Sequence, residues 1–114
     1  MKFLLQVRFN GSDGAIGQLS AEEQQQVTDE FIAIRKSAGV LDGNQFLAAS
    51  EAATVRVTDG QIQVTPGPPV EAAAAINGYY IYDAPDLDAA TEFAARIPAA
   101  RFGAVIEVRE MMER

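Results

Sequence analysis

The chain contains no cysteine and no histidine. Without cysteine it can form neither a disulfide nor a zinc–thiolate site, and it has no thiolate nucleophile. Without histidine it lacks the side chain that most often transfers protons near neutral pH and most often binds metal ions. These two absences exclude many classes of enzyme. Because no other catalytic constellation can be recognised, we expect no metal, no cofactor and, on balance, no enzymatic activity.

Positive charge is also scarce. Nine Lys and Arg side chains stand against 16 Asp and Glu, the net charge is −7, and Lys2 and Lys36 are the only lysines. Such a surface repels phosphate backbones, so we expect no binding to nucleic acid. The longest apolar runs, residues 3–5 and 72–76, are far too short to cross a bilayer, so we expect no membrane contact. The apolar start of the chain ends after five residues, too early for a signal peptide, which indicates a cytoplasmic protein.

The length of 114 residues and the apolar content of 48% indicate one domain, residues 1–114, with a core of its own. Residues 2–9 alternate and predict a strand, with one apolar face made of Phe3, Leu5, Val7 and Phe9. Turn residues predict a loop over 10–14. Ser20 and Glu23 form a capping box, which predicts the start of a helix. Its apolar face recurs at helical spacing in Val27, Phe31, Ile34 and Ala38. Gly39 fits the end of this helix, which should have about five turns.

The middle of the chain predicts a bent strand and a hairpin. Residues 40–48 alternate poorly, which indicates a bent or bulged strand. Residues 54–58 and 61–65 flank Asp59-Gly60, the strongest short hairpin signal. A two-residue turn places Val57 opposite Ile62 and Val55 opposite Val64 on one face, with Arg56 and Gln63 on the other. The corner Pro66-Gly67-Pro68-Pro69 should stop the ladder, because three of its residues lack an amide hydrogen.

The last third of the chain predicts a second strand–helix–strand unit. Residues 71–75 are a short ambiguous run that fits one helical turn, and residues 77–83 predict a strand. Asp86 should cap a helix that Pro98 ends, with an apolar stripe of Leu87, Ala90, Phe93 or Ala94, and Ile97. Residues 104–110 predict the closing strand. The order β-α-β, hairpin, β-α-β fits an antiparallel sheet with two helices on one face, an α+β fold. The bare face is rarely tolerated by a monomer, so we expect a homodimer.

Several ordered segments resemble the YCII-related family, and the DGPF-type proteins in particular. The resemblance rests on residues 54–60, 64–71, 77–83, 86–90, 97–101 and 106–109, with support from 19–23, 38–41 and the opening strand. It implies a dimeric α+β barrel, in which each unit is ferredoxin-like with an inserted hairpin. Some members carry a His/Asp pair, which cannot be carried over here. Pro66 and Pro69 stand where the family pattern has Asp and Phe. The frequent association of DGPF-type proteins with extracytoplasmic-function sigma factors suggests a regulatory or binding role.

The ferredoxin-like arrangement places the first strand between the last strand and the strand 77–83. Six polar side chains are then candidates for a ligand site on the face away from the helices: Gln6, Arg8, Tyr80, Tyr82, Glu107 and Arg109. They could bind a small anionic or aromatic molecule. An ion pair and packed tyrosines at a dimer interface are the favoured interpretation. The loop of Pro66, Gly67, Pro68, Pro69 and Glu71 could gate a cleft or supply a base, although a hairpin stop and a solvated carboxylate explain it more simply.

Two functions from different classes follow. The first is a non-enzymatic dimeric module that binds a small molecule or a protein, with a regulatory role. The alternative is a small enzyme that acts on an acidic or aromatic molecule near the dimer interface, with Arg8, Glu107 and a tyrosine in its cleft. A buried carboxylate or phenol of perturbed pKa in an open pocket would favour the enzyme, whereas a filled, dry interface would favour the binding module.

Overall fold

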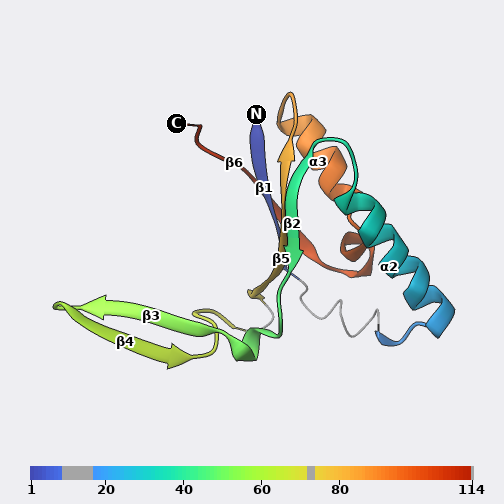
Figure 1. The fold of residues 1–114 in the computed structure, drawn as a ribbon. Helices are drawn as coiled ribbons and strands as arrows, with labels where there is room; N and C mark the ends of the chain where they lie inside the picture. The colour runs from blue at the N-terminus through green and yellow to red at the C-terminus, as the bar shows by residue number, and fades with distance from the viewer. Residues whose placement is uncertain (9–16, 72–73, 114) are drawn as a thin grey trace.

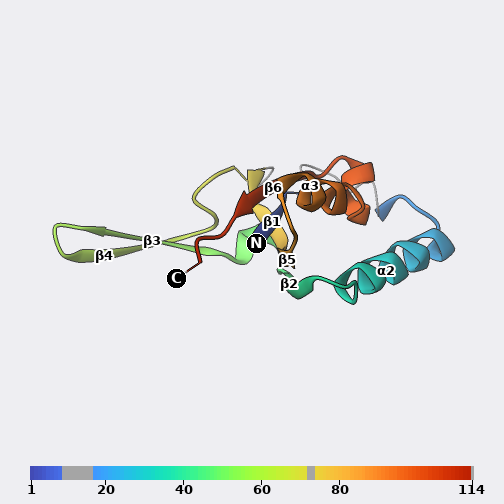
Figure 2. The ribbon, with the colours of Figure 1, turned by 90° about the horizontal axis from the view of Figure 1, so that it is seen from above.

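A computed structural model describes residues 1–8, 17–71 and 74–113. Four strands form an antiparallel sheet in the order β2-β5-β1-β6, with bounds β1 Lys2–Arg8, β2 Val40–Gln45, β5 Ile76–Asp83 and β6 Val105–Glu110. Helices α2 (Ala21–Arg35) and α3 (Leu87–Ala95) both lie on one side of this sheet (Figures 1 and 2). The α+β class is therefore confirmed, and β1 lies between β5 and β6 as predicted.

The capping box at the start of α2 is confirmed, while the predicted end of the helix is wrong. Ser20 Oγ accepts a hydrogen bond from Glu23 N at 3.2 Å, and Ser20 N donates to Glu23 Oε1 at 3.3 Å. The helix ends at Arg35 and has about four turns. Gly39 follows four residues later, where its φ of +92° turns the chain into β2 beside the Tyr82 ring. The glycine therefore directs the chain into β2 and does not cap the helix.

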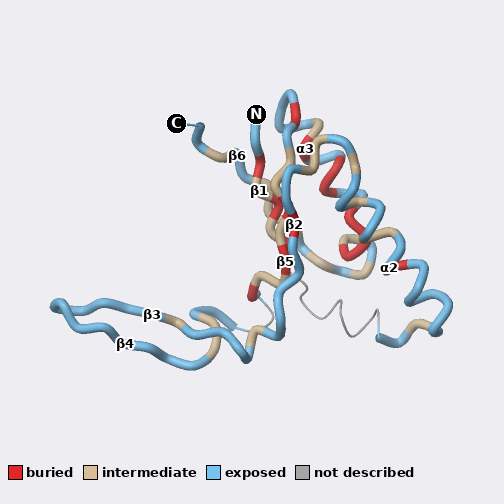
Figure 3. The backbone as a smooth tube through the Cα atoms, viewed as in Figure 1, coloured by how far each residue is buried: buried red, intermediate tan, exposed pale blue. Residues whose placement is uncertain are grey.

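The core lies between the sheet and the helices (Figure 3). From β1 it takes Phe3, Leu5 and Val7, each at most 3% exposed, as their alternation predicts. Phe9 and the loop 10–14 lie outside the described residues. From α3 and the turn after it come Ala90, Phe93, Ala94 and Ile97, all buried. The prediction for Leu87 is wrong: it is 53% exposed, because it is the first residue of α3 and only later turns of this helix reach the core.

The predicted cap of α3 is confirmed, because Asp86 Oδ1 accepts a hydrogen bond from Ala89 N at 2.8 Å. The helix ends at Ala95, and Pro98 opens the short 3-10 helix η3 (Pro98–Phe102). A proline suits this position, since the first amide of a helix has no intrahelical partner. The irregular strand before the hairpin is also confirmed: the β2 ladder is disrupted between Val40 and Asp42. A second 3-10 helix, η1 (Ala49–Glu51), leads into the hairpin.

Strands β3 (Ala53–Thr58) and β4 (Gln61–Pro66) form the predicted hairpin. Val55 pairs with Val64, Val57 with Ile62, and Arg56 with Gln63, in the predicted register. Asp59 and Gly60 have φ of 52° and 76°, as the two-residue turn requires. We call this hairpin the arm, because it extends away from the sheet on the side opposite the helices (Figures 1 and 2). The arm helps to raise the radius of gyration to 15.9 Å, against about 13 Å for a compact chain of this length.

The proline corner differs from the prediction by one residue. Pro66 is the last residue of β4 and pairs with Ala53, so it belongs to the ladder. Counted from the turn, Ala53 and Pro66 form a non-hydrogen-bonded pair, and such a position needs no amide hydrogen toward the partner strand. The next residue carries the bond: Gly67 N donates to Ala52 O at 2.7 Å. In the ambiguous run 71–75, Ala74 N donates to Glu71 O at 2.9 Å, and residues 72–73 lie outside the described residues.

Candidate functional site

The sheet face turned away from α2 and α3 carries most of the predicted site residues, and we call it the open face. Residues that pair across antiparallel strands point to the same side of the sheet. Gln6 pairs with Glu107 on one side and with Tyr79 on the other, and Leu4 pairs with Arg109. Gln6, Arg8, Glu107 and Arg109 therefore share the open face, as predicted. All of these except Arg109 are partly shielded from solvent by their neighbours.

The predicted placement of Tyr80 and Tyr82 on this face is wrong. Tyr80 pairs with Leu5 and Tyr82 with Phe3, so both tyrosines point toward the helices. Tyr80 is only 9% exposed, and the Tyr82 ring stacks on Phe93 with ring centroids 4.0 Å apart. The strand is apolar or aromatic on both sides, so its composition does not distinguish one side from the other, and a shift of one residue exchanges the faces. Tyr79 and Ile81 occupy the open face instead.

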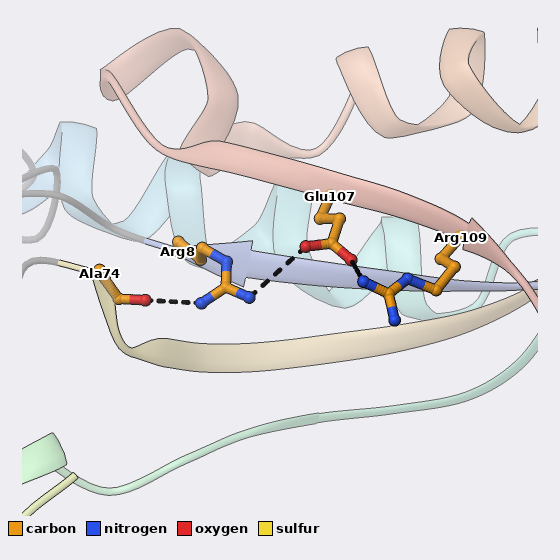
Figure 4. A network of polar contacts seen from close by, with 4 residues as sticks. All are labelled: Arg8, Ala74, Glu107 and Arg109. Atoms are coloured by element: carbon orange, nitrogen blue, oxygen red, sulfur yellow. Dashed lines mark hydrogen bonds and ion pairs between the residues drawn. The ribbon is translucent and has the colours of Figure 1, made fainter. Parts of the chain in front are cut away.

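An ion-pair cluster joins β1 and β6 on the open face (Figure 4). Arg8 Nη2 lies 3.5 Å from Glu107 Oε1, and Arg109 Nη2 lies 2.8 Å from Glu107 Oε2. Arg8 Nη1 also donates a hydrogen bond of 2.6 Å to Ala74 O, which ties the end of β1 to the segment before β5. Glu107 Oε2 is shut off from solvent, and its contact with Arg109 lacks hydrogen-bond geometry. One carboxylate thus pairs with two arginines, and its Oε2 has no hydrogen-bond partner among the residues that the structure describes.

A second polar network on the open face was missed by the sequence reasoning. Asn44 Nδ2 donates to Tyr79 Oη at 3.2 Å, and Tyr79 Oη donates to Asp42 Oδ2 at 2.8 Å. The network joins β2 to β5, and the Phe46 ring lies 5.8 Å from the Tyr79 ring, centroid to centroid. The alternation of Asp42 and Asn44 in β2 was the available signal, because it places two polar side chains on one face. The bulge beside them obscured that pattern.

A cleft of about 790 Å³ opens where the arm joins the sheet, and we call it the Arg8 cleft. Its walls are mainly apolar and come from the segment after β2, the proline corner and the start of β5. Among the lining residues are Arg8, Phe46, Leu47, Pro68, Pro69, Val70 and Ile76. Arg8 is the one predicted ligand-site residue among them. Of the predicted loop, Pro68 and Pro69 form part of the wall, whereas Pro66, Gly67 and Glu71 do not line the cleft.

The model of the YCII-related domain matches residues 3–113, nearly the whole chain. This chain belongs to the YCII-related family. The resemblance seen in the sequence is therefore confirmed at the level of the family. A comparison with curated proteins gave no match.

In this YCII-related domain a smaller cavity, of about 260 Å³, lies between α2 and the strands β2 and β5. Tyr80, Arg35 and Phe31 are among the residues that line it. Burial raises the pKa of the Tyr80 phenol above its ordinary value, and the nearby Arg35 partly opposes this rise. A phenol with a raised pKa stays protonated near neutral pH, so Tyr80 is unsuited to act as a general base there.

Over residues 1–8, 17–71 and 74–113 of the YCII-related domain, no three Asp or Glu side chains gather closely enough to hold a metal ion. Neither of the two described α-helices has the length and apolar character needed to cross a bilayer.

Proposed function

We propose that this YCII-related domain is a non-enzymatic binding module that works as a homodimer. The strand order β2-β5-β1-β6 is the one expected of a ferredoxin-like unit, and both described helices lie on one side of the sheet. The open face mixes apolar side chains such as Leu4 and Ile81 with the cluster around Glu107. Stacking two open faces would form the dimeric α+β barrel and cover these side chains.

The observation that carries the binding function is the position of Arg8. Its guanidinium belongs to the ion-pair cluster of the open face and also lines the Arg8 cleft. The wall of the mainly apolar cleft carries one arginine, Arg8, and one acidic residue, Glu51. The cleft suits a small carboxylic acid with an apolar or aromatic body that is oriented with its carboxylate on Arg8. The ligand would compete with Glu107 for Arg8. Tyr79 and Phe46 extend the aromatic surface from the cleft toward the open face.

A thermal-shift screen with small aromatic and aliphatic carboxylic acids tests the ligand site. We expect at least one acid to raise the melting temperature of the wild type, and Arg8→Ala to abolish this shift while Arg8→Lys weakens it. Arg56→Ala, which removes an exposed arginine of the arm, is the matched control and should keep the full shift. A screen without any shift, or a shift that survives Arg8→Ala, would refute the site.

Size-exclusion chromatography with light scattering tests the homodimer. Ile81→Arg places a charge at the centre of the open face and should convert the dimer into a monomer. Gln26→Arg adds the same charge to the exposed side of α2 and should leave the dimer intact. A wild type that is monomeric at high concentration would overturn the proposal.

The alternative, a small enzyme acting on an acidic or aromatic molecule, has less support. Tyr80 is a buried phenol with a raised pKa beside a cavity, a feature that would favour an enzyme, but both Tyr80 and Tyr82 point away from Arg8 and Glu107. The tyrosine on their face, Tyr79, bonds to Asp42 and Asn44 instead. A regulatory role linked to extracytoplasmic-function sigma factors, membership of the DGPF-type group and a cytoplasmic location stay predictions from the sequence. Retention of such a sigma factor on the immobilised dimer, with Ile81→Arg as control, would test the regulatory role.

A further inference from the structure

We propose that the arm closes over a second copy of this chain and buries its apolar face there. The proposal rests on the homodimer proposed above. It adds a contact that the stacking of two open faces does not itself require, because the arm stands apart from the sheet (Figure 1). The partner is therefore an identical chain, and the contacting surface is the side of the arm formed by Val55, Val57, Ile62 and Val64.

The arm gains little support from its own chain. β3 and β4 form a separate sheet of two strands, and the described part of the chain gives neither a second ladder partner. A hairpin of two strands is at best marginally stable in water. The four β-branched side chains of its apolar face are 60–73% exposed. A partner that covers them would remove from water a continuous apolar surface that the single chain leaves open.

The arm extends on the same side of the sheet as the open face (Figures 1 and 2). Its base is closed by two hydrogen bonds between its own two sides: Thr54 Oγ1 donates to Gly67 O at 2.7 Å, and Gly67 N donates to Ala52 O at 2.7 Å. A second copy stacked on the open face would therefore lie beside the arm. Two-fold symmetry would bring the arm of that copy back to the first.

The length and the charge of the arm suit a second copy of this chain as its partner. A six-residue strand spans about 20 Å, and two stacked sheets lie about 10 Å apart, so an arm that extends away from the open face is long enough to pass the partner's sheet. Residues 53–66 contain only two charged side chains, Arg56 and Asp59, whose charges cancel, whereas the whole chain carries −7. Two copies repel each other through most of their surface, and the arm is one of the segments that escape this repulsion.

The test compares two double variants of the arm by light scattering over a dilution series. Val57→Thr with Ile62→Thr makes the apolar face polar but keeps β-branched residues, so the hairpin should still form. Gln61→Thr with Gln63→Thr changes the opposite face and leaves the charge unaltered. We expect the first variant to raise the dissociation constant of the dimer about tenfold or more, and the second to change it less than about twofold.

Hydrogen exchange of the arm amides gives an independent readout. In the wild type, exchange of β3 and β4 should slow as the protein concentration rises through the dissociation constant, and in the Val57→Thr, Ile62→Thr variant it should not. If the wild type dimerises and both double variants have the same dissociation constant as the wild type, the arm does not contact the partner. The proposed homodimer would then be retained. If the wild type stays monomeric, as Ile81→Arg is expected to be, the homodimer itself fails and the arm proposal with it.

Discussion

Strand β1 and the strands of the arm share one sequence pattern, yet they end in opposite surroundings. Phe3, Leu5 and Val7 alternate with polar or mixed residues and are almost fully buried beneath the helices. Val55 and Val57 alternate in the same way and are 60% and 66% exposed. The sheet with its helices, which we call the body, covers its own apolar side chains, whereas the arm presents them to solvent. Alternation thus predicts which residues share a face but does not predict what covers that face.

The difference also separates two sources of stability. In the body, the Tyr82 and Phe93 rings stack between β5 and α3, which joins segments distant in the sequence. The arm depends on a local turn, on cross-strand pairs and on two hydrogen bonds at its root. We therefore expect truncations in the body to change the stability of the whole domain, and truncations in the arm to act locally. Four predictions follow this contrast, from the largest effect to the smallest.

Removal of one aromatic ring from the core should strongly destabilise the body. Phe93→Ala takes away a side chain that is 1% exposed and should lower the free energy of unfolding by about 3–5 kcal/mol. Ile62→Ala removes an exposed side chain of the arm and should cost less than about 0.5 kcal/mol under dilute, monomeric conditions. Urea denaturation of both variants measures the contrast. Equal losses would show that the arm and the body share one core.

Alanine substitutions at two glycines should destabilise the protein for different reasons. A Cβ at Gly43 of β2 would lie 2.6 Å from Cδ1 of the Tyr80 ring, so Gly43→Ala forces this core ring to move and should cost about 1–3 kcal/mol. Gly60, in the turn of the arm, has open space around it but a φ of +76°, so Gly60→Ala should cost about 1 kcal/mol through backbone strain. Thermal unfolding should reveal the first loss, and faster exchange of the arm amides the second. A Gly43→Ala variant as stable as the wild type would contradict the close approach.

The ion-pair cluster should contribute modestly. Glu107→Gln leaves Arg8 and Arg109 near each other without their shared carboxylate. We expect a loss of about 0.5–1 kcal/mol, because the three side chains are 28–76% exposed and water screens their pairing. The loss should shrink at high salt. Glu92→Gln, on the exposed side of α3, is the matched control and should be neutral within about 0.5 kcal/mol. A Glu107→Gln loss that does not depend on salt would indicate packing in place of charge pairing.

Ionisation of Tyr80 should lower the stability of the domain only at high pH. Burial raises the pKa of this phenol above 10.0 in the folded state, so its contribution to stability is complete below pH 10.0 and is lost as the pH rises through the folded pKa. Tyr80→Phe should therefore reduce the fall in stability above about pH 10. A Tyr80→Phe variant whose stability falls above pH 10 as steeply as that of the wild type would contradict this prediction. Denaturation midpoints measured between pH 8 and 11 decide between these outcomes.

Local signals predicted much of this structure from the sequence. The Asp59-Gly60 turn fixes the register of the arm residue by residue, and the Ser20–Glu23 box fixes the start of α2, because both depend on neighbours in the chain. The faces of β5 were not predictable in this way. Its side chains are mostly apolar or aromatic on both sides. Only the pairing with β1, in which Tyr80 lies opposite Leu5 and Tyr79 opposite Gln6, decides that Tyr80 is inside and Tyr79 outside.

The candidate site was only half predictable for the same reason. Apolar and polar residues alternate along much of β1 and β6, so the sequence distinguishes the two faces of these strands clearly. It therefore predicts a common face for Gln6, Arg8, Glu107 and Arg109. The Arg8 cleft combines the segment after β2, the proline corner and the start of β5. These walls meet only because the arm leaves and re-enters the sheet at one place. No spacing in the sequence encodes that meeting, so Phe46 and Val70 could not be assigned to the cleft in advance.

The position of Pro66 has a consequence for solubility. Because it occupies a non-hydrogen-bonded place in β4, its ring interrupts the outer row of amides on one edge of the hairpin. The edge of β3 (Ala53–Thr58) has no proline and a single charged residue, Arg56, so it could add a strand from another molecule. Mutual repulsion between chains of charge −7 opposes such stacking at low ionic strength. Concentrated salt would weaken this protection, and we expect fibrous aggregates to grow then from the exposed edge of β3.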